Sequence, residues 1–143
     1  MFILDTNVVS ALRRPEKADP KLTAWASAIP ATSFFLSSIT VLELELGTLL
    51  KERKDREQGV VLRTWLDHQV LPRFEGRIIA VDSAVARCCA GLHVPNRSAE
   101  RDALIAASAL VHGMTVATRN VADFAPMGVG IFNPWDGDDI RES

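Results

Sequence analysis

The sequence predicts a single α/β domain, in which helices cover both faces of a central parallel sheet of about five short strands. Short apolar segments alternate with amphipathic ones along the chain, an order typical of parallel sheets with crossover helices. The strand candidates are almost wholly apolar, as expected of strands buried on both faces. With 143 residues, 48% of them hydrophobic, the chain can bury one sizeable core, and its length favours one domain over two.

The predicted strands are short apolar runs bounded by polar or turn-forming residues. The first run ends at the carboxylate of Asp5, and the second ends at Ser37 and Ser38. Runs of this length that are rich in branched and aromatic residues are typical of buried strands. We expect strands at residues 2–4, 34–36, 77–81, 115–118 and 129–132. The tail after Pro134 is acidic and is expected to be frayed.

Helices are predicted where apolar residues recur every three or four positions. Pro20 stands in the first turn of its helix, whereas Pro72 is expected to end another. Ser98 is the expected N-cap of the last helix, which Gly113 ends. The predicted helices cover residues 6–12, 20–29, 39–54, 57–71, 83–92 and 100–112.

Composition limits the functions that the chain can have. A formal net charge of −2 argues against a broad basic surface for duplex nucleic acid. A mean hydropathy of +0.10 suggests that a partner covers some apolar surface, so oligomerisation is expected.

Cysteine usage and hydropathy indicate the compartment. Cys88 and Cys89 are adjacent, and neighbouring cysteines rarely satisfy disulfide geometry, which indicates buried thiols in a reducing compartment. No run reaches the roughly 20 apolar residues that cross a bilayer. Asp5 interrupts the apolar start, which argues against a signal sequence. The protein is therefore expected to be cytoplasmic, with no membrane partner.

Four carboxylates stand where predicted strands end or on predicted helices. Asp5 follows the first strand, Asp102 lies in the first turn of a helix, and Asp123 comes after the fourth strand. Glu43 lies near the apolar side of the helix over residues 39–54, where Glu45 is the competing choice. Because the carboxyl ends of parallel strands meet at one edge of a sheet, these acids are expected to form one pocket.

Each of these acids also has a purely structural explanation. Asp5 could serve as a helix N-cap, and Glu43 lies three residues after Thr40, the spacing of a capping box. Asp102 would be favoured by the helix dipole, and Asp123 could be an ordinary turn residue. The prediction of a pocket therefore depends on the four acids jointly.

Chemistry narrows what such a pocket binds. A carboxylate cluster without Cys or His suits hard cations with oxygen ligands, Mg²⁺ or Mn²⁺, rather than zinc. His68, His93 and His112 have no ligand spacing in the sequence. Acidic Mg²⁺ sites bind phosphate oxygens and activate water, so phosphodiester hydrolysis is the expected reaction class. Without metal, the carboxylates would repel one another, and at least one should bind a proton.

Polar and basic residues near these acids fit the same chemistry. Four polar residues could orient metal-bound waters, although each suits a helix cap or a turn equally well, and several arginines could hold phosphates as a basic rim. The polar residues are Thr6, Asn7, Thr118 and Asn120. The arginines are Arg13, Arg14, Arg97, Arg101 and Arg119. The basic run over residues 51–56 is expected to be a solvated helix end.

Taken in order, these segments resemble the PIN-domain ribonucleases, specifically the VapC-type toxins of type II toxin–antitoxin systems. The segments are Leu4-Asp5-Thr6-Asn7, Glu43-Leu44, the run Asp102-Ala103-Leu104-Ile105-Ala106-Ala107, Thr118-Arg119-Asn120 with Asp123-Phe124, and Asn133-Pro134-Trp135. The resemblance covers nearly the whole chain and implies a single PIN domain over residues 1–143, with a PIN-like three-layer fold.

The resemblance also implies an activity, a site and partners. The activity is that of a Mg²⁺-dependent endoribonuclease acting on RNA, and the catalytic and metal-binding residues would be Asp5, Glu43, Asp102 and Asp123. The partners would be a second copy of the chain in a homodimer and a VapB-type antitoxin, whose C-terminal segment blocks the pocket. Two departures are Glu45, a second acid beside Glu43, and Cys88-Cys89, which replace a bulkier apolar pair.

The alternative interpretation is a non-catalytic PIN-like scaffold that binds RNA or protein without cutting. The complete set of four acids argues against it. A phosphatase of the haloacid-dehalogenase type would share the strand that ends in Asp5, but it needs a second aspartate two positions on, where this chain has Asn7.

Overall fold

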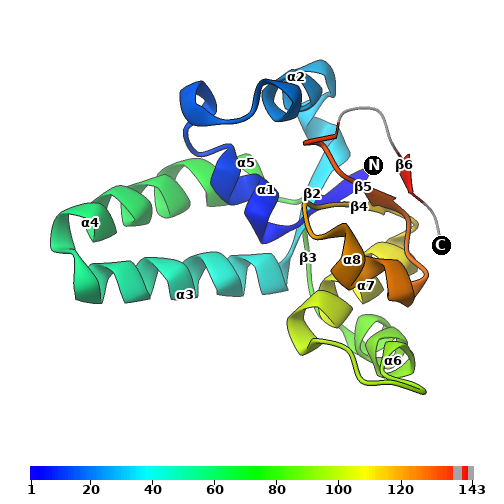
Figure 1. The fold of residues 1–143 in the computed structure, drawn as a ribbon. Helices are drawn as coiled ribbons and strands as arrows, with labels where there is room; N and C mark the ends of the chain where they lie inside the picture. The colour runs from blue at the N-terminus through cyan, green and yellow to red at the C-terminus, as the bar shows by residue number, and fades with distance from the viewer. Residues whose placement is uncertain (137–139, 142–143) are drawn as a thin grey trace.

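The chain folds into three layers, with a central sheet between two groups of helices (Figure 1). The computed structural model describes residues 1–136 and 140–141. Five strands run parallel in the order β3-β2-β1-β4-β5, with β1 in the middle. These strands are β1 Phe2–Leu4, β2 Phe34–Ser37, β3 Ile78–Ile79, β4 Thr115–Ala117 and β5 Ile131–Phe132. The predicted fold class is confirmed.

The central strands bury both of their faces. Ile3 of β1 and Val116 of β4 pack into one apolar core, whereas their neighbours Leu4 and Ala117 pack into another on the opposite face. Successive side chains of a strand point to opposite faces, so a sheet covered on both sides needs apolar residues at every position. This requirement explains the continuous apolar runs in the sequence.

The helices divide between the two faces. The core around Leu4 includes side chains from α1, α2 and α3, and the core around Ile3 includes side chains from α6, α7 and α8. The helices are α1 Thr6–Ala11, α2 Pro20–Ala28, α3 Ser38–Lys54, α4 Arg56–Trp65, α5 Leu71–Arg73, α6 Ser83–Leu92, α7 Glu100–His112 and α8 Val121–Phe124. In the described part of the chain, no helix has the length and apolar composition to cross a membrane.

Helices α3 and α4 form an antiparallel arm that projects away from the sheet (Figure 1). Asp55 joins them, and its carboxylate accepts a hydrogen bond from the Gln58 N–H at 3.2 Å. The two helices approach closely at Gly59, where a Cβ atom would lie 2.5 Å from the Glu52 Cα. Only glycine permits this approach without displacing the backbone.

Two predicted helix boundaries are wrong. The helix that begins at Arg56 does not end at Pro72, because a π-helical turn, Leu66–Val70, leads into α5, which contains this proline. A wider turn before proline makes room for a ring that clashes with the carbonyl four residues earlier in a regular α-helix. Ser98 does not cap α7, which begins after Ala99. Its hydroxyl donates to the Leu92 carbonyl at 3.3 Å instead.

Two elements near the C-terminus were not expected. The segment around Asp123, for which a turn was one of two interpretations, forms α8. A sixth strand, β6 Ile140–Arg141, pairs antiparallel with β5, so the tail does not remain irregular throughout. The expectation of a frayed tail otherwise falls partly on residues 137–139 and 142–143, which lie outside the described residues.

Candidate active site

Asp5 lies at the centre of the site because of the register of the sheet. Leu4 of β1 is level with Ala117 of β4, so the next residues, Asp5 and Thr118, leave the sheet side by side. Asp5 is 5% exposed, and its carboxylate accepts hydrogen bonds from the Thr6 N–H and the Thr118 hydroxyl, both at 2.8 Å. Asn7 Nδ2 donates to the same carboxylate at 3.2 Å. Asp5 is thus both the N-cap of α1 and the most buried acid of the site.

Glu43 reaches the same place from α3. The Thr6 hydroxyl donates to Glu43 Oε1 at 2.7 Å, and the Arg101 Nη1 lies 3.7 Å from Glu43 Oε2. The capping-box explanation of Glu43 is wrong, because α3 begins at Ser38 and its N-cap is Ser37. Glu43 therefore lies at the Asp5 site, with Arg101 beside it.

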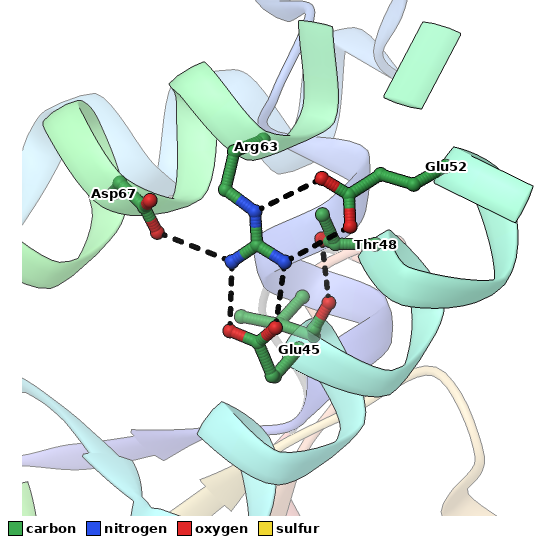
Figure 2. Close-up of polar contacts among 6 residues, drawn as sticks. Glu45, Thr48, Glu52, Arg63 and Asp67 are labelled. Carbon is green, nitrogen blue, oxygen red and sulfur yellow. Dashed lines mark hydrogen bonds and ion pairs between the residues drawn. The ribbon is translucent and has the colours of Figure 1, made fainter. Parts of the chain in front are cut away.

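Glu45 points into the arm instead. Figure 2 shows its carboxylate beside the Arg63 guanidinium, with an Nη2 to Oε2 distance of 2.7 Å. Arg63 also pairs with Glu52 at 3.2 Å and with Asp67 at 3.4 Å. The hydrogen bonds from Arg63, together with its positive charge, lower the pKa of Glu45. Of the two candidate glutamates, only Glu43 lies at the Asp5 site.

Asp102 and Asp123 complete the carboxylate cluster, which we define as Asp5, Glu43, Asp102 and Asp123. Asp102 lies in the first turn of α7 and Asp123 on α8. Burial raises the pKa of Asp102 to about 6, and the negative charges of the other three acids add to this rise. The four acids therefore lie close enough to act on one another electrostatically, as predicted for a metal-free pocket.

The pKa of Asp5 is also raised. Burial is the main cause, and the charges of Glu43 and Asp123 contribute. Hydrogen bonds from the Thr118 hydroxyl and the Thr6 N–H act in the opposite direction because they stabilise the ionised form. Neutral donors thus offset part of the cost of burying a carboxylate among other acids.

The predicted polar neighbours form one hydrogen-bonded network with Asp5. Thr118 is fully buried, and its hydroxyl oxygen accepts from the Asn120 N–H at 2.9 Å while the hydroxyl donates to Asp5. Asn7 Nδ2 lies 3.4 Å from the same hydroxyl oxygen. Asn120 therefore joins the network through its backbone. Thr6, Asn7 and Thr118 contribute side chains that fix the carboxylates of Asp5 and Glu43.

Four of the five predicted arginines divide into two groups, whereas Arg97 is an exposed residue of the loop before α7. Arg101 pairs with Glu43 and belongs to the cluster rather than to an outer rim. Arg13, Arg14 and Arg119 line a separate hollow, together with Lys17 and Trp135. Sequence reasoning did not assign Lys17 or Trp135 to this site. The sequence pattern that could have indicated them is a lysine three residues after Arg14 and an aromatic residue shortly after the predicted strand at residues 129–132.

Comparison with known proteins assigns the family. The family model described as PIN domain matches residues 2–126. The chain belongs to the PIN-domain family. This PIN domain is 37% identical over 140 residues to the toxin FitB of Neisseria gonorrhoeae, and the match covers 94% of this chain and 99% of FitB.

Two further relatives agree with this assignment. The PIN domain is 35% identical over 141 residues to the VapC ribonuclease Y4jK of Sinorhizobium fredii, with 95% of this chain and 99% of Y4jK covered. It also matches a chain in the solved structure of FitAB bound to an IR36 DNA fragment. The TM-score is 0.87 at 35% identity, covering 97% of this chain and 99% of that chain.

The carboxylate cluster of this PIN domain fits a divalent cation. Its acids offer several oxygen atoms and no sulfur or nitrogen ligand, which is the donor set of Mg²⁺ and Mn²⁺. Arg101 is the one cation that forms an ion pair with a cluster acid among the described residues. Four acids with one partner leave an excess of negative charge, which adds to the larger effect of burial in raising the pKa of Asp5 and of Asp102.

A second group of metal-ligating residue types lies elsewhere in the PIN domain. Ligand atoms of Cys89, His93 and Glu100 lie within 4.8 Å of one another, although the sequence suggested no ligand role for the histidines. The Ser98 N–H donates to His93 Nδ1 at 3.0 Å, so the neutral ring carries its proton on Nε2. That nitrogen faces Glu100 at 3.3 Å. The ring nitrogen nearest the other two groups therefore has no lone pair for a metal.

Proposed function

We propose that this PIN domain is a metal-dependent endoribonuclease that hydrolyses RNA phosphodiester bonds, and the toxic component of a toxin–antitoxin pair. The observation that carries the proposal is the carboxylate cluster around the buried Asp5. The name of one relative, the VapC ribonuclease Y4jK, supports the activity, and the name of another, the toxin FitB, supports the toxic role.

The proposed cofactor is Mg²⁺, for which Mn²⁺ can substitute. Asp5, Glu43, Asp102 and Asp123 would hold it and are the proposed catalytic residues. A bound divalent cation binds phosphate oxygens, lowers the pKa of water and stabilises the leaving oxygen.

The chain's own residues keep this site ready for binding. Thr118 and Thr6 donate hydrogen bonds that hold Asp5 and Glu43 at 2.8 and 2.7 Å. The bond from Thr118 favours the ionised form of Asp5, the form that binds a cation. Asn7 and Asn120 fix Thr118 from two sides, and Arg101 offsets one charge at Glu43.

The proposed partners are an RNA substrate, a VapB-type antitoxin and a second copy of the chain. A partner would cover apolar side chains that the arm exposes, among them Leu49, Leu50 and Val60 at 51%, 60% and 61%. The solved relative is a FitAB assembly on DNA, which supports an antitoxin partner. A cytoplasmic location is proposed because Cys88 and Cys89 are free thiols.

We further propose that residues 1–143 form one PIN domain. The family match ends at residue 126, but β5 pairs with β4 in the same sheet. Ile131 of β5 also packs into the core shared with α7.

The alternative is a PIN-like scaffold that binds RNA or protein without cutting. Calorimetric titration with Mg²⁺ or Mn²⁺ separates the two, because a nuclease site must bind the cation. Absence of binding to the wild-type protein, together with absence of RNA cleavage, would favour the scaffold.

The direct test of the nuclease is Asp5→Asn. This change keeps the shape of the side chain and removes its charge, so RNA cleavage should fall by at least about 100-fold, more than the usual loss from an outer metal-site residue. Glu45→Gln is the matched control, because this acid pairs with Arg63 on the arm and should leave cleavage intact. Circular dichroism checks that both variants fold. Retained cleavage in a folded Asp5→Asn protein would refute the assignment.

A further inference from the structure

A hollow of about 370 Å³ shares Arg119 with the hollow that is lined by Asp123 of the carboxylate cluster. We call it the basic pocket and define it by the side chains that matter for binding. These are Arg13, Arg14, Lys17, Asp19, Arg119 and Trp135. Four cations face one carboxylate in this set, although the whole chain has a net charge of −2. Composition therefore conceals a strongly positive site.

The cations of the basic pocket are free to bind a ligand. In the part of the chain that the structure describes, Arg13, Arg14, Lys17 and Arg119 form no ion pair with an acid, in contrast to Arg63. The one acid of the pocket, Asp19, is the N-cap of α2. Unpaired cations around a concave surface are typical of phosphate binding.

The pocket also has an aromatic wall. The Arg119 guanidinium lies over the Trp135 ring, 5.2 Å from its centroid. The Trp135 N–H donates to Asn133 Oδ1 at 2.9 Å, which fixes the backbone of the tryptophan. Guanidinium and indole groups both stack against nucleobases, whatever the sequence of the RNA, so we call this pair the platform.

Arg119 connects the basic pocket to the carboxylate cluster. Its N–H donates to Asn7 Oδ1 at 3.3 Å, and Asn7 Nδ2 donates to Asp5 at 3.2 Å. Arg119 also lines a second hollow, of about 590 Å³, whose wall includes Asp123. An RNA strand bound at the carboxylate cluster can therefore pass over Arg119 into the basic pocket.

We propose that the basic pocket binds a nucleotide of single-stranded RNA next to the phosphate that is cleaved. Its phosphate contacts Arg13, Arg14 and Lys17, and its base stacks on the platform of Arg119 and Trp135. The strand must be single, because a duplex covers the faces of its bases. This assignment rests on the proposed nuclease function, since the path begins at the carboxylate cluster.

The first test measures RNA binding without cleavage. Fluorescence anisotropy of a short labelled oligoribonucleotide is recorded in EDTA over a range of salt concentrations. The double variant Arg14→Ala/Lys17→Ala should bind about 10-fold more weakly, and its salt slope should be smaller by about 1.4, because each phosphate contact to a single strand contributes about 0.7. The control Arg53→Ala/Lys54→Ala removes two exposed cations from the end of α3 and should bind like wild type.

The second test examines the aromatic wall. RNA should quench the intrinsic fluorescence of the wild-type protein, and Trp135→Phe should lose this quenching while Trp25 and Trp65 remain. Trp135→Leu retains an apolar side chain for packing and should weaken RNA binding by about 10-fold, the loss expected for one stacked base.

Several outcomes would overturn the assignment. RNA affinity and salt slope in Arg14→Ala/Lys17→Ala that match those of the control would do so. So would a glutamate-rich peptide that binds the pocket while RNA does not, because the occupant would then be an acidic protein segment. If wild type binds RNA through the pocket but does not cleave it with Mg²⁺, RNA binding by the pocket stands, whereas the nuclease proposal and the place of the nucleotide next to a cleaved phosphate fall. If cleavage is normal and the pocket variants cleave like the control, the nuclease stands and the pocket falls.

Discussion

Replacing Asp102 with Asn should make the metal-free protein more stable. Burial and the charges of Asp5, Asp123 and Glu43 raise the pKa of Asp102 from 3.8 to about 6. A carboxyl group with a raised pKa in the folded state contributes stability at low pH, and this contribution is lost as the pH rises through about 6. Above that pH, the ionised Asp102 destabilises the fold until a cation neutralises the cluster.

The size of this effect follows from the shift in pKa. Each pKa unit corresponds to about 1.4 kcal/mol, so the full shift of Asp102 sets an upper limit of about 3 kcal/mol. Asp102 is partly exposed, and solvent screening reduces the expected gain in the free energy of unfolding to about 1 to 2 kcal/mol. For a chain of this size, that gain raises the Tm by about 2 to 8 °C.

Thermal unfolding in EDTA tests the prediction. Asp102→Asn should unfold at a higher temperature than wild type near about pH 8, and the difference should disappear near about pH 4, where the wild-type carboxyl is protonated. Glu45→Gln is the control, for which the opposite change in Tm is expected. The ion pair with Arg63 lowers the pKa of Glu45, so removing that charge should lower the Tm.

Addition of Mg²⁺ should reverse the order of the two Tm values, so that wild type unfolds at a higher temperature than Asp102→Asn. A cation that binds only the folded state at about 100 times its Kd adds about 2.7 kcal/mol, and Asp102→Asn should lose most of this increment. The reasoning is refuted if Asp102→Asn shows no gain at high pH in EDTA, or if Glu45→Gln shows an equal gain.

Two further changes probe the site and the arm. Thr118→Val removes the hydroxyl that donates to Asp5 and accepts from the Asn120 N–H, so it should cost about 1 to 3 kcal/mol of stability and move the acidic limb of RNA cleavage to higher pH. An unchanged pH profile and Tm would contradict this role. Gly59→Ala places a Cβ 2.5 Å from the Glu52 Cα. It should lower the free energy of unfolding, measured by chemical denaturation, by about 1 to 3 kcal/mol. Gly47→Ala, which meets nothing within 4 Å, should instead add about 0.5 to 1 kcal/mol. Equal effects of the two alanines would rule out the close approach as the cause.

Local chemistry made several elements predictable. The apolar run of β1 followed by Asp5 indicated both a strand end and a helix start, and the structure has both. Gly113 ends α7 with a φ of 67°, as its position after a periodic apolar pattern predicted. In these places the signal lies within a few neighbouring residues, so no distant contact is needed to interpret it.

Other features required contacts between distant residues. Glu43 and Glu45 are two positions apart on one helix and therefore point in very different directions. Only the position of Arg63, 18 residues beyond Glu45, decides which glutamate lies away from the site. Which ring nitrogen of His93 carries the proton likewise depends on the backbone N–H of Ser98 in the following loop. No pattern within either helix contains this information.

The sequence by itself determined the parallel α/β architecture and the four acids to consider, because apolar periodicity and strand ends are local properties of the chain. The tertiary structure alone decided which side chains lie close enough to interact electrostatically. The register of β1 against β4 places Thr118 on Asp5, and the turn after β4 places Arg119 between the carboxylate cluster and the basic pocket. Charge interactions depend on distance in space, and distance in space is set only when the sheet and its helices pack together.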